Sequence, residues 1–357
     1  MKKIRVLVVD DSALVRSLLK DIIDRQSDME CIGVANDPLI AREMIRELDP
    51  DVITLDVEMP RMDGLDFLGK LMRLRPTPVV MISTLTKYGA DVTLRALELG
   101  AVDFVAKPRM DPVNGFGILA AQIVDKVRVA ASARIKRLVS MPLQHLSQGK
   151  KGEVGPVLSS RYCSRTLVLV GASTGGTEAL KKILVKLPVG FPAVVITQHM
   201  PPGFTATFAA RLNSMCQIAV QEAINGERIL PGRAYIAPGG SQLSVRRNGD
   251  SYVTVVEDSE PVNRHRPSVE VLFKSAARVV GRYAYGLMLT GMGDDGAKAM
   301  REMRDAGSYN FVQDEDSCVV FGMPRAAILQ GAADEVLPLS DLADALMERV
   351  KIGPYML

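Results

Sequence analysis

Several features that would indicate other classes of protein are scarce or missing in this sequence. The 357 residues include four cysteines, which lie far apart and have no C-x-x-C spacing. Zinc sites and disulfide frameworks need regular cysteine spacing, so we expect free thiols in a reducing compartment. No apolar run approaches the roughly 20 residues of a membrane span, and the N-terminal "MKKIRVLVVDDS" lacks the pattern of a signal peptide. We therefore expect a cytoplasmic protein with no membrane insertion.

Strong charge of one sign is also lacking. The formal net charge is only +3, whereas 47% of the residues are hydrophobic. Nucleic-acid-binding domains usually carry a marked basic excess, so we expect no nucleic-acid partner. The length predicts about two domains, and the apolar content suffices for a core in each.

The N-terminal part alternates short apolar runs with amphipathic stretches. The runs predict buried strands at 4–9, 51–56, 78–83 and 101–106, and the amphipathic stretches predict helices at 12–25 and 38–49. Such alternation is typical of a doubly wound parallel sheet. Functional groups in these sheets gather at the carboxyl ends of the strands.

A second α/β series begins at residue 166. It predicts strands at 166–170, 192–197, 233–237 and 283–290, and helices at 177–187, 204–214, 268–280 and 297–306. Asn-Gly within 242–256 predicts a hairpin. The residues before this series are rich in Gly, Ser, Pro and basic side chains without periodicity, which indicates a linker whose first residues can complete a helix. We therefore predict domains at 1–125 and 163–357, with a linker at 126–162.

Polar side chains follow the strands of the N-terminal part. Asp10 and Asp11 end the first strand, Asp56 ends another, and Ser83 and Lys107 follow two more. Clustered carboxylates suit Mg²⁺, which prefers oxygen ligands and can also engage a phosphoryl group. Lysine can pair with a phosphate oxygen. The pattern predicts a site for a magnesium ion and a phosphoryl group.

A G-x-S-x-G motif at 171–175 lies between a predicted strand and a predicted helix. It does not fit a Walker A loop, because Thr177 and Glu178 follow its last glycine instead of Lys-Ser/Thr. It does not fit the dinucleotide fingerprint either, because Ser173 occupies the second glycine position. The acidic Glu178 also disfavours an anion there. A strand-to-helix turn that exposes Ser173 as a nucleophile fits better.

Histidine, the usual general base, is scarce. His145 lies in the predicted linker, and His265 is flanked by Arg264 and Arg266, whose positive charge disfavours an imidazolium. His199 directly follows a predicted strand, so we expect it to be the general base. The orienting carboxylate is Asp294 or Asp295 in "LTGMGDDG", and spacing does not separate them.

The glycines of that loop can expose backbone N–H groups for an oxyanion hole, with the N–H of Thr174 as a second donor. The chain order would be Ser, His, Asp, whereas α/β-hydrolases have Ser, acid, His. A different doubly wound fold must therefore carry the site.

Residues 1–125 resemble the receiver domain of two-component response regulators. The resemblance implies a flavodoxin-like fold, phosphorylation of Asp56 and Mg²⁺ as a cofactor. It further implies Mg²⁺ ligation by Asp10, Asp11 and Asp56, a switch hydroxyl on Ser83, a phosphoryl contact from Lys107 and a switch aromatic at Phe104. Phosphorylation adds charge and acceptor oxygens, which can bias a two-state surface.

"GASTGGTEAL", "ITQHMPPGFT", "YIAPGG", "PVNRHRPSVEVLF", "LTGMGDDG" and "SCVVFGMPRAA" together resemble the chemotaxis protein-glutamate methylesterases of the CheB family. The resemblance implies a Rossmann-like catalytic domain with a triad of Ser173, His199 and Asp295. It also implies oxyanion contacts from the backbone of Thr174 and Met292, and no cofactor at the esterase site.

The same resemblance implies demethylation of glutamate methyl esters, and deamidation of certain glutamines, on the cytoplasmic helices of chemoreceptors. A chemotaxis histidine kinase would be the phosphodonor, receptor arrays the location, and a monomer the expected state. Arg264 and Arg266 could face acidic receptor helices or form salt bridges. Two alternatives remain: a response-regulator transcription factor, and an inactive receptor-binding protein that keeps the esterase fold.

Overall fold

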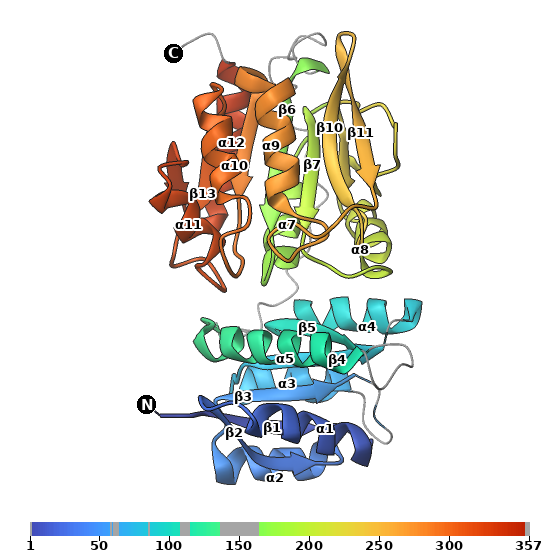
Figure 1. Ribbon diagram of the computed structural model, residues 1–357, viewed down its shortest axis with the longest axis vertical. Helices are drawn as coiled ribbons and strands as arrows, with labels where there is room; N and C mark the ends of the chain where they lie inside the picture. The colour runs from blue at the N-terminus through green and yellow to red at the C-terminus, as the bar shows by residue number, and fades with distance from the viewer. Residues whose placement is uncertain are drawn as a thin grey trace, which may run out of the picture.

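The computed structural model describes residues 2–57, 59, 64–84, 86–107, 115–135 and 164–353. The N-terminal domain consists of β1 (Ile4–Val9), α1 (Ala13–Asp24), β2 (Met29–Ala35), α2 (Pro38–Leu48), β3 (Val52–Asp56), α3 (Gly64–Leu74), β4 (Val79–Thr84), α4 (Lys87–Glu98), β5 (Asp103–Lys107) and α5 (Gly115–Ser132). Figure 1 shows this domain below the C-terminal one.

The C-terminal domain follows with a longer series of elements. These are β6 (Leu167–Ala172), α7 (Gly176–Leu184), β7 (Ala193–Gln198), α8 (Phe204–Asn213), β8 (Ala219–Glu222), β9 (Arg233–Ile236), β10 (Gln242–Asn248), β11 (Ser251–Glu257), α9 (Val269–Val279), the 3₁₀ helix η1 (Gly281–Tyr283), β12 (Ala284–Met288), α10 (Ala297–Asp305), β13 (Tyr309–Gln313), α11 (Met323–Leu329), β14 (Glu335–Leu337) and α12 (Leu339–Ile352).

The N-terminal sheet has the order β2-β1-β3-β4-β5 and parallel pairing throughout. Successive side chains of a strand point to opposite faces, so β1 contributes to two cores. Val6 and Val8 pack with α1 and α5, whereas Leu7 and Val9 pack with α2, α3 and α4. Helices therefore cover both faces, and the predicted doubly wound fold is confirmed.

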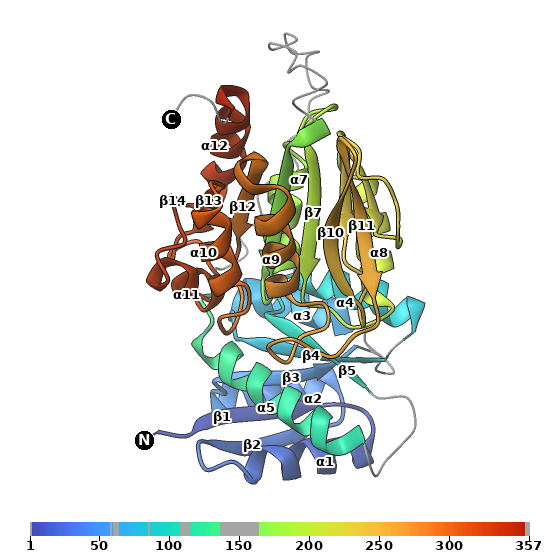
Figure 2. The ribbon, with the colours of Figure 1, turned by 45° about the horizontal axis from the view of Figure 1, so that its top comes forward.

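The C-terminal domain contains a seven-stranded parallel sheet in the order β14-β13-β12-β6-β7-β9-β8. One face packs against α7, α8 and α12, and the other against α9, α10 and α11. The predicted hairpin is present as antiparallel β10 and β11, which turn at Gly249 and pack beside α9 (Figure 2). This domain is therefore also doubly wound, with the hairpin as an addition.

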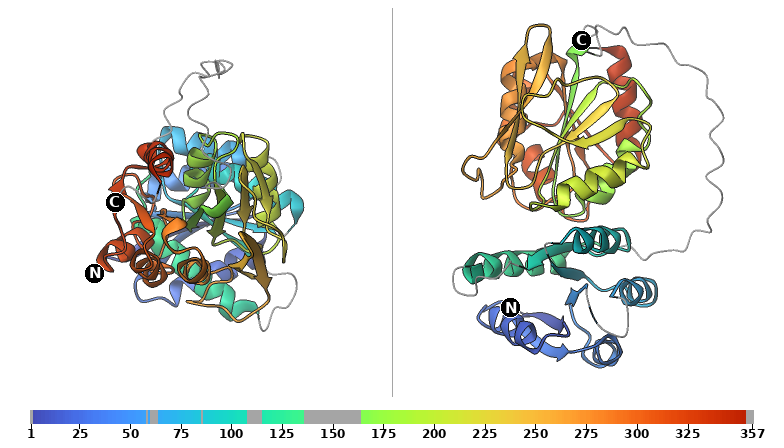
Figure 3. Two further views of the ribbon diagram at one scale, coloured as in Figure 1. Left: turned by 90° about the horizontal axis from the view of Figure 1, so that it is seen from above. Right: turned by 90° about the vertical axis from the view of Figure 1, so that its right-hand side faces the viewer.

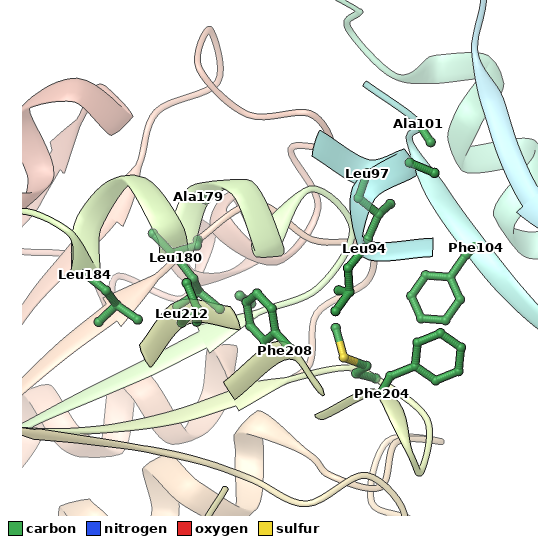
Figure 4. Close-up of a cluster of buried hydrophobic side chains, with 14 of the residues drawn as sticks. Leu94, Leu97, Ala101, Phe104, Ala179, Leu180, Leu184, Phe204, Phe208 and Leu212 are labelled. Atoms are coloured by element: carbon green, nitrogen blue, oxygen red, sulfur yellow. The ribbon is translucent and has the colours of Figure 1, made fainter. Parts of the chain in front are cut away.

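One hydrophobic cluster includes buried residues from both domains. Phe104 of β5 stacks on Phe204 of α8, with ring centroids 4.6 Å apart. Leu94 and Leu97 of α4 lie on the same side as Phe104 and face Phe208 (Figure 4). Helix α4 and strand β5 thus lie against the lower edge of the C-terminal domain (Figures 1 and 3).

Helix α5 continues to Ser132, beyond residue 125, where we place the end of the first domain from sequence. Residues 136–162 of the predicted linker, including His145, lie outside the described residues. Within the described part of the chain, no helix has both the length and the apolar character needed to cross a membrane.

Candidate functional site

Ser173 lies in a tight turn between β6 and α7. Its N–H donates to the carbonyl of Thr290, 3.0 Å away, which ties the turn to the loop after β12. Gly175 has φ +76°, and a Cβ there would lie 2.6 Å from Val319. Glycine suits such a left-handed position because it has no side chain to clash. The predicted strand-to-helix turn is therefore present, with Ser173 partly exposed.

His199 follows β7, the strand next to β6, and its main chain is fixed against the Ser173 turn. Its N–H donates to the carbonyl of Ala172 at 3.0 Å. Before it, Gln198 donates from Nε2 to the carbonyl of Ser173 at 2.9 Å. The two neighbouring strand ends thus bring Ser173 and His199 to one place, as the sequence predicts for parallel strands.

The imidazole of His199 is held by Asp295. Nε2 lies 2.8 Å from Oδ2 of Asp295, and the side chain of His199 is only 8% exposed. Nδ1 is buried and has no hydrogen-bond partner among the described residues. Nδ1 is therefore the ring nitrogen that can accept a proton. No hydrogen bond joins Nδ1 and Ser173 in this structure, and such bonds often tighten only when substrate is bound.

The side chain of Asp295 is buried against the N-terminus of α9 and accepts several hydrogen bonds. Besides His199, the donors are Asn263 Nδ2 at 2.8 Å, Ser268 Oγ at 2.7 Å and the N–H of Val269 at 2.6 Å. Burial by itself would raise the pKa of this carboxyl, but the hydrogen bonds from His199, Asn263 and Ser268 outweigh it and lower the pKa to about 2. Asp295 therefore remains a carboxylate at neutral pH.

Burial distinguishes Asp294 from Asp295, between which sequence spacing does not decide. Asp294 is exposed, and Asp295 is 1% exposed and contacts His199. The next residue, Gly296, has φ +85° and precedes α10. Only Asp295 is thus placed to orient the imidazole.

Two backbone N–H groups near Ser173 have no acceptor among the described residues. They belong to Thr174 and Met292, which follow Ser173 and Gly291 in adjacent loops. A Cβ on Gly291 would lie 2.8 Å from the Cβ of Ser173, so the two loops are in close contact. Unpaired N–H groups beside a nucleophile suit the developing charge of an oxyanion.

The ring of His265 lies against the ring of His199. The sequence does not indicate this contact. The two rings are stacked, with centroids 3.7 Å apart and planes 7° from parallel. Burial first, and then the charge of His199, lower the pKa of His265 to about 4. Arg266 forms an ion pair with Asp258 at 2.6 Å. Sequence reasoning assigns no role to Asn263 or Ser268, although the motif "PVNRHRPSVEV" contains both.

The N-terminal domain has a separate acidic site. Carboxylate oxygens of Asp10, Asp11 and Asp56 lie within 4.8 Å of one another. Lys107 Nζ contacts Asp56 Oδ2 at 2.8 Å and Asp10 Oδ2 at 3.0 Å. Burial alone would lower the pKa of Lys107, but the two carboxylates raise it. The three carboxylates are hard oxygen donors of the kind that Mg²⁺ prefers, so this donor set fits that ion.

Ser83 and Phe104 are both buried and contact other parts of the protein. The Ser83 hydroxyl lies 3.3 Å from the carbonyl of Gly89 and accepts from Thr93 Oγ1 at 2.6 Å, both on α4. Phe104 is 5% exposed and lies against Phe204. Ser83 therefore contacts α4, and Phe104 contacts the C-terminal domain directly.

Comparisons with known proteins identify both halves of the chain. Residues 168–346 match the CheB methylesterase family, and residues 6–113 match the response regulator receiver domain. A protein-glutamate methylesterase/protein-glutamine glutaminase 1 of Albidiferax ferrireducens is 69% identical over 98% of this chain and 95% of its own. A relative of the same name in Geobacter metallireducens is 59% identical over 95% of this chain and 94% of its own.

Solved structures agree with these matches. The CheB methylesterase catalytic domain of Thermotoga maritima is 39% identical, with a TM-score of 0.50, and the similarity covers 51% of this chain and 97% of that one. The family match covers half of the chain, and the curated relatives cover nearly all of it. The chain belongs to the CheB methylesterase family and carries an N-terminal response regulator receiver domain.

Proposed function

We propose that this protein is a serine hydrolase that demethylates glutamate methyl esters, and deamidates certain glutamines, on chemotaxis receptors. One observation carries the proposal: the buried His199–Asp295 pair lies beside the turn that carries Ser173, in a chain of the CheB family. The large α/β domain argues against a transcription factor, whose output domain is usually small and helical.

The first half of the reaction follows from the two nitrogens of His199. Asp295 fixes the tautomer with the proton on Nε2, so Nδ1 accepts the proton of Ser173 as its oxygen attacks the γ-carbonyl. The N–H groups of Thr174 and Met292 stabilise the oxyanion of the tetrahedral intermediate. The C–O bond to the methoxy group then breaks as His199 donates the proton to the methoxy oxygen, which leaves as methanol.

Water completes the cycle. His199 takes a proton from water, which attacks the acyl-enzyme ester on Ser173, and returns that proton to the Ser173 oxygen as the ester bond breaks. The receptor glutamate leaves Ser173 with its side chain as a free carboxylate. With a glutamine substrate the same steps apply, and ammonia leaves in place of methanol.

The receiver domain supplies regulation in this proposal. A histidine kinase phosphorylates Asp56, and Mg²⁺ held by Asp10, Asp11 and Asp56 would neutralise part of the phosphoryl charge. Lys107, which contacts both Asp56 and Asp10 before phosphorylation, would follow the phosphoryl oxygens. Ser83 would turn toward the phosphoryl group, and Phe104 would leave its place against Phe204.

We further propose that the unphosphorylated receiver covers the esterase site. Support comes from contacts between β5 and α4 of the receiver and the edge of the C-terminal sheet that carries Ser173. A receptor helix could not reach this edge while these contacts persist. The protein would act as a cytoplasmic monomer at receptor arrays, with receptor helices and the kinase as partners.

Methanol release from methylated receptor membranes tests the enzymatic proposal. Wild type, Ser173→Ala and the control Ser340→Ala are compared, with folding checked by circular dichroism. Ser340 is exposed at the start of α12, far along the chain from the site. We expect Ser173→Ala alone to lose activity; methanol release at the wild-type rate by this variant would remove Ser173 from the mechanism.

A further inference from the structure

A short turn at residues 262–266 packs against the buried His199–Asp295 pair. Asn263 and Arg264 in this turn have φ values of +51° and +69°, which non-glycine residues rarely adopt. Such backbone conformations persist only where the surrounding structure enforces them, and they cluster at functional sites. The backbone conformation of this turn therefore points to a functional role.

The turn is fixed on two sides. Val262 and His265 exchange backbone hydrogen bonds of 3.0 and 2.9 Å. The buried amide of Gln242, at the start of β10, donates to the carbonyl of His265 at 3.0 Å and accepts from the N–H of Ser268 at 2.7 Å. These bonds hold the backbone of His265 in one position relative to α9.

From this position the turn contacts both members of the pair. Asn263 Nδ2 donates to Asp295 Oδ1 at 2.8 Å. The ring of His265 stacks on the ring of His199, with centroids 3.7 Å apart and planes 7° from parallel. The turn thus supports the Asp295 carboxylate by a hydrogen bond from Asn263 and the His199 imidazole by the flat face of the His265 ring.

We propose that His265 is a positioning residue, whose ring fixes the plane of the His199 imidazole so that Nδ1 points to Ser173 while Nε2 remains on Asp295. The proposal rests on the proposed function, in which His199 is the general base. A single hydrogen bond to Asp295 leaves the imidazole able to rock about Nε2, because the torsion that turns a histidine ring is broad. A parallel ring in van der Waals contact removes that freedom.

The charge of His265 is compatible with this role. Burial, and then the charge of His199, lower the pKa of His265 to about 4, so it is neutral at neutral pH. A neutral ring adds no repulsion when His199 becomes an imidazolium. What His265 contributes is its planar face, not a proton.

Two substitutions distinguish the contribution of the flat ring of His265 from that of its nitrogens. His265→Phe retains a flat ring without titratable nitrogens, whereas His265→Leu retains apolar volume without a flat face. Full-length protein, activated with acetyl phosphate and Mg²⁺, is assayed for methanol release over a range of receptor concentrations. We expect His265→Leu to lower kcat about 10- to 100-fold with KM within about twofold, because small misplacement of a reacting group can cost about 100-fold. His265→Phe should retain kcat within about threefold of wild type.

Two results would overturn the proposal. One is a kcat for His265→Leu equal to that of wild type. The other is a His265→Phe variant as slow as His265→Leu, because the nitrogens of His265 would then be required. Assays are run below the thermal transition of each variant, and His265→Met replaces His265→Leu, with the same expected kcat, if the latter does not fold.

Ser173→Ala distinguishes failure of this inference from failure of the proposed function. If Ser173→Ala retains activity, the proposed hydrolase mechanism is wrong. If Ser173→Ala is inactive and His265→Leu matches wild type, only the role of His265 is wrong.

Discussion

The hydroxyl of Thr174 donates a hydrogen bond to the carboxylate of Asp103, and so joins the residue after Ser173 to strand β5 of the receiver. Both side chains are buried. Asp103 also pairs with Lys126 of α5 at 2.5 Å and accepts from the N–H of Phe104 at 2.7 Å. A direct path of contacts therefore runs from the receiver to the proposed oxyanion donor.

The first prediction concerns this bond. Asp103→Ala should raise methanol release by the unphosphorylated protein about tenfold, because a hydrogen bond to a charged group is worth about 1.5–3 kcal/mol and about 1.4 kcal/mol changes an equilibrium tenfold. Addition of acetyl phosphate to Asp103→Ala should then increase methanol release only slightly further. Asp28→Ala is the matched control, since Asp28 pairs with Arg128 of the same helix α5 without contacting the C-terminal domain. Unchanged basal activity in Asp103→Ala would mean that this contact does not restrain the site.

The second prediction concerns the charged contacts between α4 and the C-terminal domain. Glu98 pairs with Lys181 at 2.9 Å and with Arg211 Nε at 3.0 Å. Burial alone would raise the pKa of Glu98, but these two partners lower it. Glu98→Gln should raise basal activity several-fold, and raising salt should have the same effect on wild type, because salt screens partly exposed ion pairs. The variant should respond less to salt than wild type does.

A control for that experiment is Asp305→Asn on α10. Asp305 pairs with Arg301 on the same exposed helix face at 2.9 Å, remote from the receiver. Equal responses to salt in Glu98→Gln, Asp305→Asn and wild type would assign the salt effect to something other than the contact between the domains.

The third prediction concerns the acidic site of the receiver. Asp56→Asn should abolish stimulation of methanol release by acetyl phosphate, because an amide cannot accept the phosphoryl group. Chelation of Mg²⁺ should have the same effect on wild type if Asp10, Asp11 and Asp56 hold that ion. Asp21→Asn, an exposed substitution on α1, serves as the control. Stimulation that survives in Asp56→Asn would place the phosphoryl group elsewhere.

The fourth prediction concerns stability at low pH. The pKa of Asp295 is lowered from 3.8 to about 2 in the folded protein. Its stabilising effect is therefore fully present above pH 3.8 and is lost as the pH falls through about 2. In urea unfolding, the stability advantage of wild type over Asp295→Asn should shrink by about 2 kcal/mol between pH 5 and pH 2. Asp294→Asn, at the exposed neighbouring position, is the matched control.

The fold could be predicted well from the sequence where strands are buried on both faces. Runs such as "IRVLVV" and "TLVLV" precede Asp10 and the Ser173 turn, and they are confirmed as β1 and β6. Strands β2, β8, β13 and β14 are not among the predicted ones. Strand β2 is mostly half-exposed, and β8 and β14 have four and three residues. Strand β13 is buried, but Asn310 and Gln313 interrupt its apolar pattern. Short or half-solvated strands carry little hydrophobic pattern, so local sequence does not reveal them.

The site is predictable only as far as local patterns extend. Glycine-rich turns after apolar runs indicate Ser173 and the 291–296 loop, but not which aspartate of that loop contacts His199. That choice depends on burial against α9, which tertiary packing decides. The stacking of His265 and the bond from Thr174 to Asp103 join residues 66 and 71 positions apart, so no local spacing predicts them.

The apolar cluster shared by the two domains has a thermal consequence. Separation of Phe104 from Phe204 would bring water to side chains on both surfaces and increase the heat capacity of the protein. Burial of apolar surface stabilises less as the temperature falls. The covered arrangement should therefore loosen in the cold, so that the ratio of stimulated to unstimulated activity depends on the temperature at which it is measured.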